Sequence, residues 1–571
     1  MTSARSSAST RRGEASRILP SGVAATRMPE ATSESSMATS LRVGSKITSV
    51  SSAVSLAVKS PAPTAPVTVP WTRRDTITTV VIGVIALFTR FVGLTMADSK
   101  GTPVFDEKHY APQAWDIFVS SFNPVLGGIE SNPGYGLVVH PPLGKQLMAL
   151  GEAIYGYTPL GWRVVAALFG AAVVVFTMLL ARRLSQSWLV ALFAGILALV
   201  DGVLLVIGRF GMLDVFILLP IVMAAWTLAG DMRQVHQRLH DAYVTGRIAE
   251  SGPFGPRLGF RWWRFATGVL LGLALSVKWS GLYYIAFFGL LSSFYDLWLR
   301  RRYGVAKPVA GTLLRDVPSA LASIVLIPAV LYVWSWRAWF ASETSVYRHS
   351  LADGTIEGSD WSWLTQLPEP IAGWFYYHFS VLRFHSELTS SGGHSHPWDS
   401  KPWSWLVASR PILYYSSTGI DCAGGQECRR MIYLFGTPAI WWLTVPILLW
   451  AIWMWISRGD RRVILPLIGF AAGFLPWLAA FDRQMYFFYA APLVPFTIVL
   501  IALALGNLAQ RGKPLPQMRK LAGYGMTSGQ LAVVVYLAVA VGMFLYFSPI
   551  LYGFVIPDGY YSQIMWLPSW R

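Results

Sequence analysis

The sequence predicts an all-α polytopic membrane protein, and three observations support this fold class. Hydrophobic residues make up 54% of the 571 residues and charged residues 13%, which is too apolar a composition for an ordinary soluble domain. Apolar runs of about 20 residues recur from Thr76 to Ser548, and each is long enough to cross a hydrocarbon core of roughly 30 Å as a helix. The basic residues are concentrated in alternate connections between these runs, which is the pattern of cytoplasmic loops.

The segment before the first apolar run, residues 1–75, is rich in Ser, Thr, Ala and Pro with scattered Arg. It cannot bury enough apolar surface to fold by itself, so we expect a disordered cytoplasmic tail. About eleven membrane-spanning helices follow, and an odd number puts the C-terminus outside the cytoplasm. The predicted spans cover residues 76–96, 162–181, 188–207, 212–230, 265–277, 281–299, 317–336, 435–456, 463–480, 485–505 and 530–547.

The net charge of +17 raises the question of nucleic-acid binding. The positive residues do not gather on one soluble face but lie in short loops, so they indicate topology and we expect no nucleic-acid partner. The basic loops are at residues 182–183, 233–264, 300–315, 458–462 and 511–520.

With the basic loops inside, the chain divides into two membrane regions and two external segments. The N-terminal membrane region, residues 76–336, contains an external loop at 97–160, and a second external segment covers residues 337–432. Residues 433–571 then form a C-terminal region of four membrane helices.

The sequence lacks the common binding motifs for soluble activated substrates. It contains no Walker A loop, no GxGxxG after a strand, and no Asp-x-Asp that would hold a nucleotide sugar through a metal. No cytoplasmic loop is long enough for a nucleotide-binding domain. An activated substrate must therefore come from elsewhere, and we expect neither a cofactor nor a metal.

The first external loop carries adjacent carboxylates, Asp106 and Glu107, in the run VFDEKHYAPQAWD. A Ser or Thr hydroxyl is a poor nucleophile unless a base takes its proton, and burial beside the bilayer would raise the pKa of a carboxyl group toward that use. The neighbouring carboxylate could orient the acceptor. The alternative is a solvated acidic pair at a helix start, where negative charge favours the first turn.

The same loop is expected to hold two helices along the membrane surface, at residues 110–119 and 143–154. The run HPPLGKQ places His140 before two prolines that lead into the second helix, with Lys145 one turn inside it. We expect His140 or Lys145 to face the carboxylate pair and to contact a sugar hydroxyl or a phosphate. Simple helix initiation is the alternative.

Three basic residues lie at the outer ends of predicted spans, namely Arg209, Lys278 and Arg483. The planar guanidinium of Arg209 matches phosphate geometry and would clamp a lipid-linked phosphate, whereas the alternative is a salt bridge between Arg209 and Asp214. Lys278 and Arg483 could simply extend to the membrane interface. Because all three run against the bias that keeps basic residues inside, an anion handled on the outer face would explain them.

The second external segment contains His394 and His396 in GGHSHPWDSKPWSW. The spacing is too loose to favour zinc, so with Trp403 these histidines are better interpreted as an aromatic rim that contacts sugar or acceptor, interfacial packing being the alternative. Cys422 and Cys428 are the two cysteines of the chain and fall in the same segment, where an oxidising exterior favours a disulfide over two free thiols.

Taken in order, the runs FDEKHY, HPPLGK, GRFGMLD, SVKWSGLYY, HSHPWDSKPWSW and FDRQMYFFYAAPLVPF resemble the protein O-mannosyltransferase family, in particular its bacterial, actinobacterial-type members. The likeness runs from about residue 76 to the C-terminus. It implies a GT-C fold and a polyprenyl-phosphate mannose donor in the cell membrane. It also implies inverting transfer to Ser or Thr of secreted polypeptides as they leave the secretion channel, on the extracytoplasmic face.

By the same resemblance, Asp106 would be the general base, Glu107 would help to hold the acceptor, and Arg209 would contact the donor phosphate. Eukaryotic members carry a β-trefoil (MIR) domain in the large external segment, and residues 337–432 are too few to hold one.

Two other functions remain open from the sequence. A transferase of the same fold class could modify a lipid or a cell-wall glycan with similarly placed carboxylates. A transporter is less consistent with the sequence, because most ionisable residues lie at outer span ends and in loops rather than in mid-span.

Overall fold

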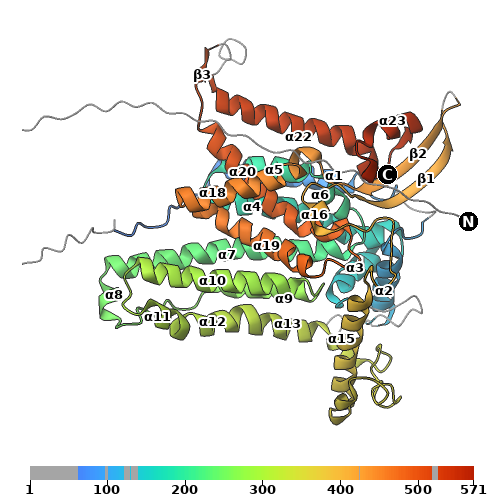
Figure 1. Ribbon diagram of the computed structural model, residues 1–571, viewed down its shortest axis with the longest axis horizontal. Coiled ribbons are helices and arrows are strands. Elements are labelled where there is room, and N and C mark those ends of the chain that lie inside the picture. Colours follow the sequence, from blue (N-terminus) through green and yellow to red (C-terminus); the bar gives the residue numbers. More distant parts are fainter. Residues whose placement is uncertain (1–61, 97–100, 121–128, 130–138, 423–424, 517–524) are drawn as a thin grey trace, which may run out of the picture. The chain divides into compact units, whose positions relative to one another are not determined.

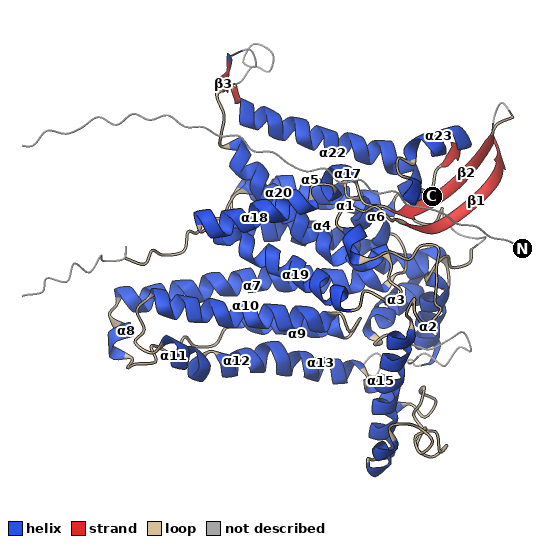
Figure 2. Ribbon diagram, in the orientation of Figure 1, coloured by secondary structure: helices blue, strands red, loops and turns tan. Residues whose placement is uncertain are grey.

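Figures 1 and 2 show a mostly helical protein whose long helices run side by side, with a small sheet at one end. This computed structural model describes residues 62–96, 101–120, 129, 139–422, 425–516 and 525–571. The residues from Pro63 onward form one compact unit.

The N-terminal membrane region is built around α4, which packs against α1, α5 and α7. Its helices begin and end where the sequence places caps: Thr72 caps α1, Thr158 caps α4 and Ser187 caps α5. The elements are α1 (Arg73–Phe91), α4 (Pro159–Ser185), α5 (Trp188–Leu199), α6 (Gly202–Ile207), α7 (Leu213–Val244), α8 (Arg247–Glu250), α9 (Trp262–Leu275), α10 (Gly281–Arg302), α11 (Pro308–Arg315), α12 (Val317–Leu321) and α13 (Ile327–Ser335). A π-helical turn, Ala322–Leu326, joins α12 to α13.

The first external loop forms the two helices that the sequence predicts, α2 (Glu107–Ser120) and α3 (Leu143–Tyr155). They pack on each other, and α3 packs on α4. Residues 121–128 and 130–138 of this loop lie outside the described residues.

The second external segment forms short helices and a sheet that the all-helical prediction did not contain. Strands β1, β2 and β5 pair antiparallel in the order β1-β2-β5, and Figure 2 shows this sheet beside α23. The segment contributes α14 (Arg337–Ala341), a 3-10 turn (Ser362–Gln366), α15 (Glu369–Glu387), α16 (Pro402–Trp405), β1 (Ile412–Asp421) and β2 (Glu427–Leu434). The third strand of the sheet, β5 (Val555–Pro557), comes from the C-terminal region.

The C-terminal region supplies the remaining helices of the described residues. They are α17 (Pro438–Trp441), α18 (Thr444–Arg458), α19 (Ile464–Ala479), α20 (Val494–Ala509), α22 (Ser528–Tyr552) and α23 (Asp558–Ile564), with 3-10 turns at Arg461–Val463, Phe487–Leu493 and Pro568–Trp570 and short strands β3 (Pro514–Leu515) and β4 (Met526–Thr527). α20 contacts α5, α4 and α22, so the two membrane regions share one core.

In the described residues, eight helices are long and apolar enough to cross a membrane, and α5 and α9 are shorter apolar helices. Helical residues fall within each of the eleven predicted spans, and the multi-pass membrane architecture is confirmed. In the apolar windows of α7 and α20, 83% of the residues are buried within the protein, against 22% for α22. α7 and α20 therefore form the centre, and α22 presents its apolar side chains outward.

The predicted span at residues 188–207 is interrupted in the structure. α5 ends at Leu199 and α6 starts at Gly202, because the carboxylate of Asp201 accepts a hydrogen bond from the backbone N–H of Leu204 and starts a new helix. The other Asp201 oxygen accepts from the indole N–H of Trp441 at 2.8 Å. This aspartate is buried and joins the two membrane regions.

Candidate active site

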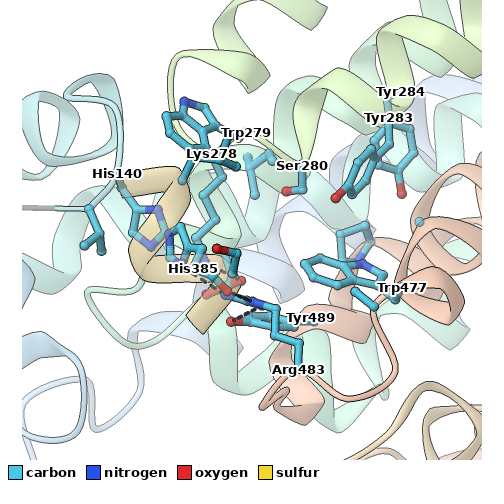
Figure 3. A pocket seen from close by; sticks show the side chains of 18 residues that line it. His140, Lys278, Trp279, Ser280, Tyr283, Tyr284, His385, Trp477, Arg483 and Tyr489 are labelled. Carbon is cyan, nitrogen blue, oxygen red and sulfur yellow. Dashed lines mark hydrogen bonds and ion pairs between the residues drawn. The ribbon is translucent and has the colours of Figure 1, made fainter. Parts of the chain in front are cut away.

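A cavity of about 310 Å³ opens where six separate parts of the chain meet. They are the loop before α3, the start of α7, the α9–α10 turn with the start of α10, α15, α19 and the segment before α20, and Figure 3 shows the side chains that line the cavity. Two backbone contacts fix this meeting: the N–H of Leu143 donates to the carbonyl of Ser276, and the N–H of Gln484 donates to the carbonyl of Leu388. The lining includes His140, Asp214, Lys278, His385, Arg483 and Tyr489.

Two cations, Lys278 and Arg483, line the cavity as the sequence predicts. Lys278 Nζ lies 2.9 Å from Asp214 Oδ1, so the aspartate pairs with Lys278 and not with Arg209. The second oxygen of Asp214 is buried and has no hydrogen-bond partner among the described residues. Arg483 donates to the carbonyl of His385 at 3.2 Å and to the hydroxyl of Tyr489 at 3.4 Å, contacts that aim its guanidinium into the cavity.

Two histidines, His140 and His385, stack with ring centroids 6.0 Å apart (Figure 3). Burial lowers the pKa of His140 well below its ordinary value, and the nearby charge of Lys278 lowers it further. Burial, followed by the charge of Arg483, lowers the pKa of His385 to about 4. Both rings are therefore neutral near pH 7, and each can donate one hydrogen bond without adding charge.

Asp106 precedes α2, and its carbonyl accepts from the backbone N–H groups of His109 and Tyr110 in the first turn. Its half-buried side chain does not line the cavity itself, but its carboxylate interacts electrostatically with Lys278 and Asp214, which do. Burial raises the pKa of Asp106 to about 6, while the charge of Lys278 opposes this rise. The carboxylate is therefore a base of near-neutral strength beside the cavity.

Glu107 lies in a different environment from its neighbour. It is fully buried, and its two oxygens accept from Arg163 Nε and Nη2, both at 2.7 Å. They also accept from the backbone N–H of Gly211 at 2.8 Å and of Val104 at 3.2 Å. With these four donors the carboxylate has no capacity left for an acceptor, so the predicted role of Glu107 in holding the acceptor directly is replaced by a structural one.

The residue before the pair, Phe105, has φ 53°, a left-handed conformation that costs energy for a non-glycine residue. Its ring stacks on Tyr414 of β1 with centroids 4.2 Å apart. This stacking holds the turn from which the two carboxylates diverge.

Arg209 is 4% exposed and lies away from the cavity lining. Its guanidinium donates to the carbonyls of Thr89, Arg90, Val92 and Gly93 at the C-terminal end of α1. A cation there compensates the negative end of the helix dipole and satisfies its last carbonyls. Both sequence interpretations of Arg209, the phosphate clamp and the pair with Asp214, are therefore corrected: its donors cap α1.

The other predicted site residues are scattered around this centre. Lys145 is buried in α3 and does not line the cavity. His394, His396 and Trp403 are exposed on the second external segment, with the ring of His396 against Tyr486. In the described parts of the chain no three His, Cys, Asp or Glu side chains group closely enough to hold a metal ion.

Cys422 and Cys428 form a disulfide that closes the hairpin between β1 and β2.

Sequence reasoning missed Arg163 and His385. Arg163 lies inside a predicted apolar span, and a charge at that position is itself a signal of a buried partner. His385 had no comparable signal, because a single histidine in an external helix has no pattern around it.

Comparisons with known proteins identify the family of the chain. The family model described as "Dolichyl-phosphate-mannose-protein mannosyltransferase" matches residues 159–342, and the one described as "C-terminal four TMM region of protein-O-mannosyltransferase" matches residues 370–570. The polyprenol-phosphate-mannose–protein mannosyltransferase of Corynebacterium glutamicum is 64% identical over 510 residues, covering 89% of this chain and 96% of the relative. That of Mycobacterium tuberculosis is 43% identical over 499 residues, covering 87% and 92%.

The fold is also found in a solved structure. A Saccharomyces cerevisiae protein O-mannosyltransferase complex bound to its sugar donor aligns with TM-score 0.65 at 16% identity, covering 88% of this chain and 93% of the matched chain. The predicted GT-C fold is therefore confirmed. Because two family models together match more than half of the chain and a relative is 64% identical across 89% of it, the chain belongs to the protein O-mannosyltransferase family.

Proposed function

We propose that this mannosyltransferase moves mannose from polyprenyl-phosphate mannose to a Ser or Thr hydroxyl of an exported polypeptide, with inversion and on the extracytoplasmic face. The observation that carries the proposal is a near-neutral carboxylate, Asp106, beside a cavity with two cations, Lys278 and Arg483. This combination fits a reaction that needs a base at one end and an anion site at the other.

The proposed step breaks the bond between mannose C1 and the phosphate oxygen. The acceptor oxygen forms the new bond to C1 from the opposite face, its proton goes to Asp106, and the electron pair of the broken bond leaves with the phosphate. Lys278 and Arg483 stabilise the charge that grows on the departing phosphate. The carboxylate needs little strength because the phosphate is already a good leaving group.

Two neutral histidines line the same cavity as the two cations. His140 and His385 can donate to sugar hydroxyls or to the phosphate without competing with the two cations for charge. Donation to the sugar would orient C1 for in-line attack, which is a large part of what such a site must supply.

The buried pair of Glu107 and Arg163 acts through Asp106. It fastens the start of α2 to α4 and, through Gly211, to the loop before α7. Asp106 is adjacent to this anchored glutamate, so the position of its carboxylate beside the cavity is constrained.

The acceptor is proposed to approach over the second external segment. Asp399 accepts from the backbone N–H of Met485 at 2.8 Å, which ties the segment with His394, His396 and Trp403 to the cavity wall near Arg483. Exposed aromatic and imidazole groups suit contact with an extended Ser/Thr-rich chain. An external site of this kind would also suit coupling to polypeptides leaving the secretion channel.

The test uses membranes with labelled polyprenyl-phosphate mannose and a Thr/Ala/Pro-rich peptide. We expect Asp106→Asn to lower transfer by roughly 10²-fold or more while donor binding is retained. We expect Arg483→Met to raise the KM for donor by roughly tenfold, because a charge-assisted contact to the phosphate is lost. Asp353→Asn, an exposed acid of the second external segment, serves as the matched control and should behave as wild type.

Normal turnover in Asp106→Asn would remove this carboxylate from the mechanism. Label in lipid or glycan, with none in the peptide, would overturn the acceptor part of the proposal and leave the donor part standing. A single-hexose mass shift on the peptide Ser or Thr is the expected product.

A further inference from the structure

A second cavity, of about 360 Å³, lies at the other end of the helices and is lined by three arginines. Arg183 comes from the end of α4, and Arg233 and Arg238 come from α7. Its other lining residues are Thr68, Gly230, Gln234, Gln237 and Trp263. The lining within the described residues contains no acidic side chain.

The two cavities lie at different levels along α7. Asp214 lines the first cavity and Gly230 lines the second, and both lie on α7. Gly230 comes sixteen residues after Asp214, which at 1.5 Å per residue is about 24 Å along the helix axis. Figure 1 shows α2, α3 and α15 at one end of α7 and α8 at the other.

Among the described residues, no carboxylate forms an ion pair with the three arginines of this second cavity. In the described part of the chain the three guanidinium groups bond to backbone carbonyls: Arg183 to Trp226 at 2.7 Å, Arg233 to Arg183, and Arg238 to Leu258 and Phe260. Like charges held this close are unfavourable unless an anion joins them.

Two nearby carboxylates are paired with other arginines, and a third bonds to a neutral amide. The carboxylate of Asp75 pairs with Arg182, and that of Asp231 pairs with Arg261. The carboxylate of Asp241 accepts from the Gln237 amide at 2.8 Å. The charge of the cavity therefore calls for an anion from outside the chain.

The walls of the cavity hold the guanidinium group of Arg183 in place. Arg183 lies between two indole rings, 3.7 Å from the centroid of Trp226 and 4.4 Å from that of Trp263. A Cβ on Gly230 would come within 2.7 Å of Arg183 Nη1 and 3.0 Å of the Trp263 ring, so the glycine keeps the floor of the cavity open.

Aromatic side chains mark the level of the membrane interface at the mouth. Phe260 and Trp262, next to the lining residue Trp263, are 56% and 67% exposed. Exposed tryptophan at a helix end is typical of the headgroup level of a bilayer, and basic pockets between helices at that level bind lipid headgroups.

We propose that this cavity is a binding site for a phosphate group, supplied by an anionic phospholipid of the leaflet opposite the mannosyl-transfer site. The phosphate oxygens accept hydrogen bonds from Arg233 and Arg238, and the guanidinium group of Arg183 adds positive charge to the site. The acyl chains lie along the apolar surface beside Trp262. The proposal does not rest on the mannosyl transfer itself.

The experiment compares full-length protein in nanodiscs of phosphatidylcholine with and without phosphatidylglycerol. Native mass spectrometry after release from the nanodisc then measures the retained lipid. Wild type should retain phosphatidylglycerol in preference to phosphatidylcholine, and Arg233→Gln and Arg238→Gln should each lower its occupancy roughly fivefold. Arg247→Gln, which removes an exposed charge from α8 outside the cavity, is the matched control and should retain the lipid.

A second arm separates a lipid from a soluble anion. Inorganic phosphate is titrated into protein in phosphatidylcholine nanodiscs while the unfolding temperature is measured. Stabilisation by phosphate without selective retention of phosphatidylglycerol would keep the phosphate site but overturn its assignment to a lipid. Arg233→Lys keeps the charge and should retain most of the lipid, which guards against a variant that merely folds poorly. Equal retention of the two lipids, or equal occupancy in Arg233→Gln and Arg247→Gln, would overturn the proposal.

Discussion

Asp106 and Glu107 are adjacent in the chain, yet their carboxylates have different surroundings. Glu107 is saturated by Arg163 and two backbone N–H groups, whereas the carboxylate of Asp106 interacts electrostatically with Lys278 and Asp214. A salt bridge keeps a carboxylate ionised and fixed, and partial burial without such a bridge raises its pKa. The division of labour between anchor and base follows from this difference.

The pKa of Asp106 predicts how transfer depends on pH. The pKa is raised to about 6, so the base form is present above about pH 6 and is lost as the pH falls through that value. We expect kcat/KM to fall about tenfold per pH unit below about pH 6 and to level off above it. Initial rates across this range measure the effect.

Burial lowers the pKa of His140 well below its ordinary value and that of His385 to about 4, so these histidines are not expected to produce an inflection near pH 6. The residual rate of Asp106→Asn should lack the inflection. An unchanged inflection in that variant would assign the titration to another group.

Replacing Glu107 should affect stability first. Glu107→Gln leaves the buried Arg163 without a counter-charge, and breaking such a pair costs about 3–5 kcal/mol. We expect a lower unfolding temperature in detergent, together with reduced transfer. Asp106→Asn should cause no such loss, because burial already disfavours its charged form.

The double variant Glu107→Gln/Arg163→Met is the control for this prediction. It removes the unpaired charge and should recover part of the lost stability. If the single and double variants unfold at the same temperature, the pair contributes little to the fold.

At the scale of elements, the break between α5 and α6 matters most. The apolar run at residues 188–207 predicts a single span. Asp201 within it, however, accepts hydrogen bonds from the backbone N–H of Leu204 and from the indole of Trp441. Thr437 adds to the junction by donating to the carbonyl of Val200 and accepting from the N–H of Gly202. The interruption is therefore the place where the two membrane regions are fastened together.

Substitution of Asp201 tests this junction. Asp201→Ala removes the cap of α6 and leaves the Trp441 indole N–H without an acceptor, a combined loss of about 2–4 kcal/mol. Asp201→Asn keeps an acceptor oxygen and should lose much less. Unfolding temperatures of the two variants in the same detergent give the comparison, and equal values would show that the junction is held elsewhere.

At the scale of the whole molecule, the cavity depends on contacts between distant segments. Glu107 and Arg163 are 56 residues apart, and His385 and Arg483 are 98 residues apart. Neither pair can form until the helices between them have packed.

The start of the compact unit gives a prediction at this scale. The predicted tail extended to residue 75, whereas α1 begins at Arg73 and the carbonyls of Val69 and Pro70 accept from Arg182. Deletion of residues 1–61 should leave transfer and unfolding temperature unchanged. Deletion of residues 1–72 removes these carbonyls and the Thr72 cap, and should lower the unfolding temperature.

Expression and membrane insertion of both truncations are compared by quantitative blotting before activity is assayed. Loss of turnover in correctly inserted protein without residues 1–61 would show that this segment has a function of its own.

The apolar runs were sufficient to predict the helices. A run of about 20 apolar residues is helical in a membrane whatever surrounds it, because lipid cannot satisfy its backbone groups. The sequence also drew attention to Asp106 and His140 in the first external loop and to Lys278 and Arg483 at the outer ends of spans. Charged residues at span ends are costly unless they have a partner or a function.

The roles of the individual charged side chains could be distinguished only from the way the helices pack. Arg209 and Arg483 look alike in sequence, yet Arg209 caps α1 and Arg483 faces the cavity. The same holds for Asp106 and Glu107, whose partners come from distant helices. The physical reason is that a buried charge takes its role from the groups brought against it, and those groups are set by helix packing rather than by neighbouring residues.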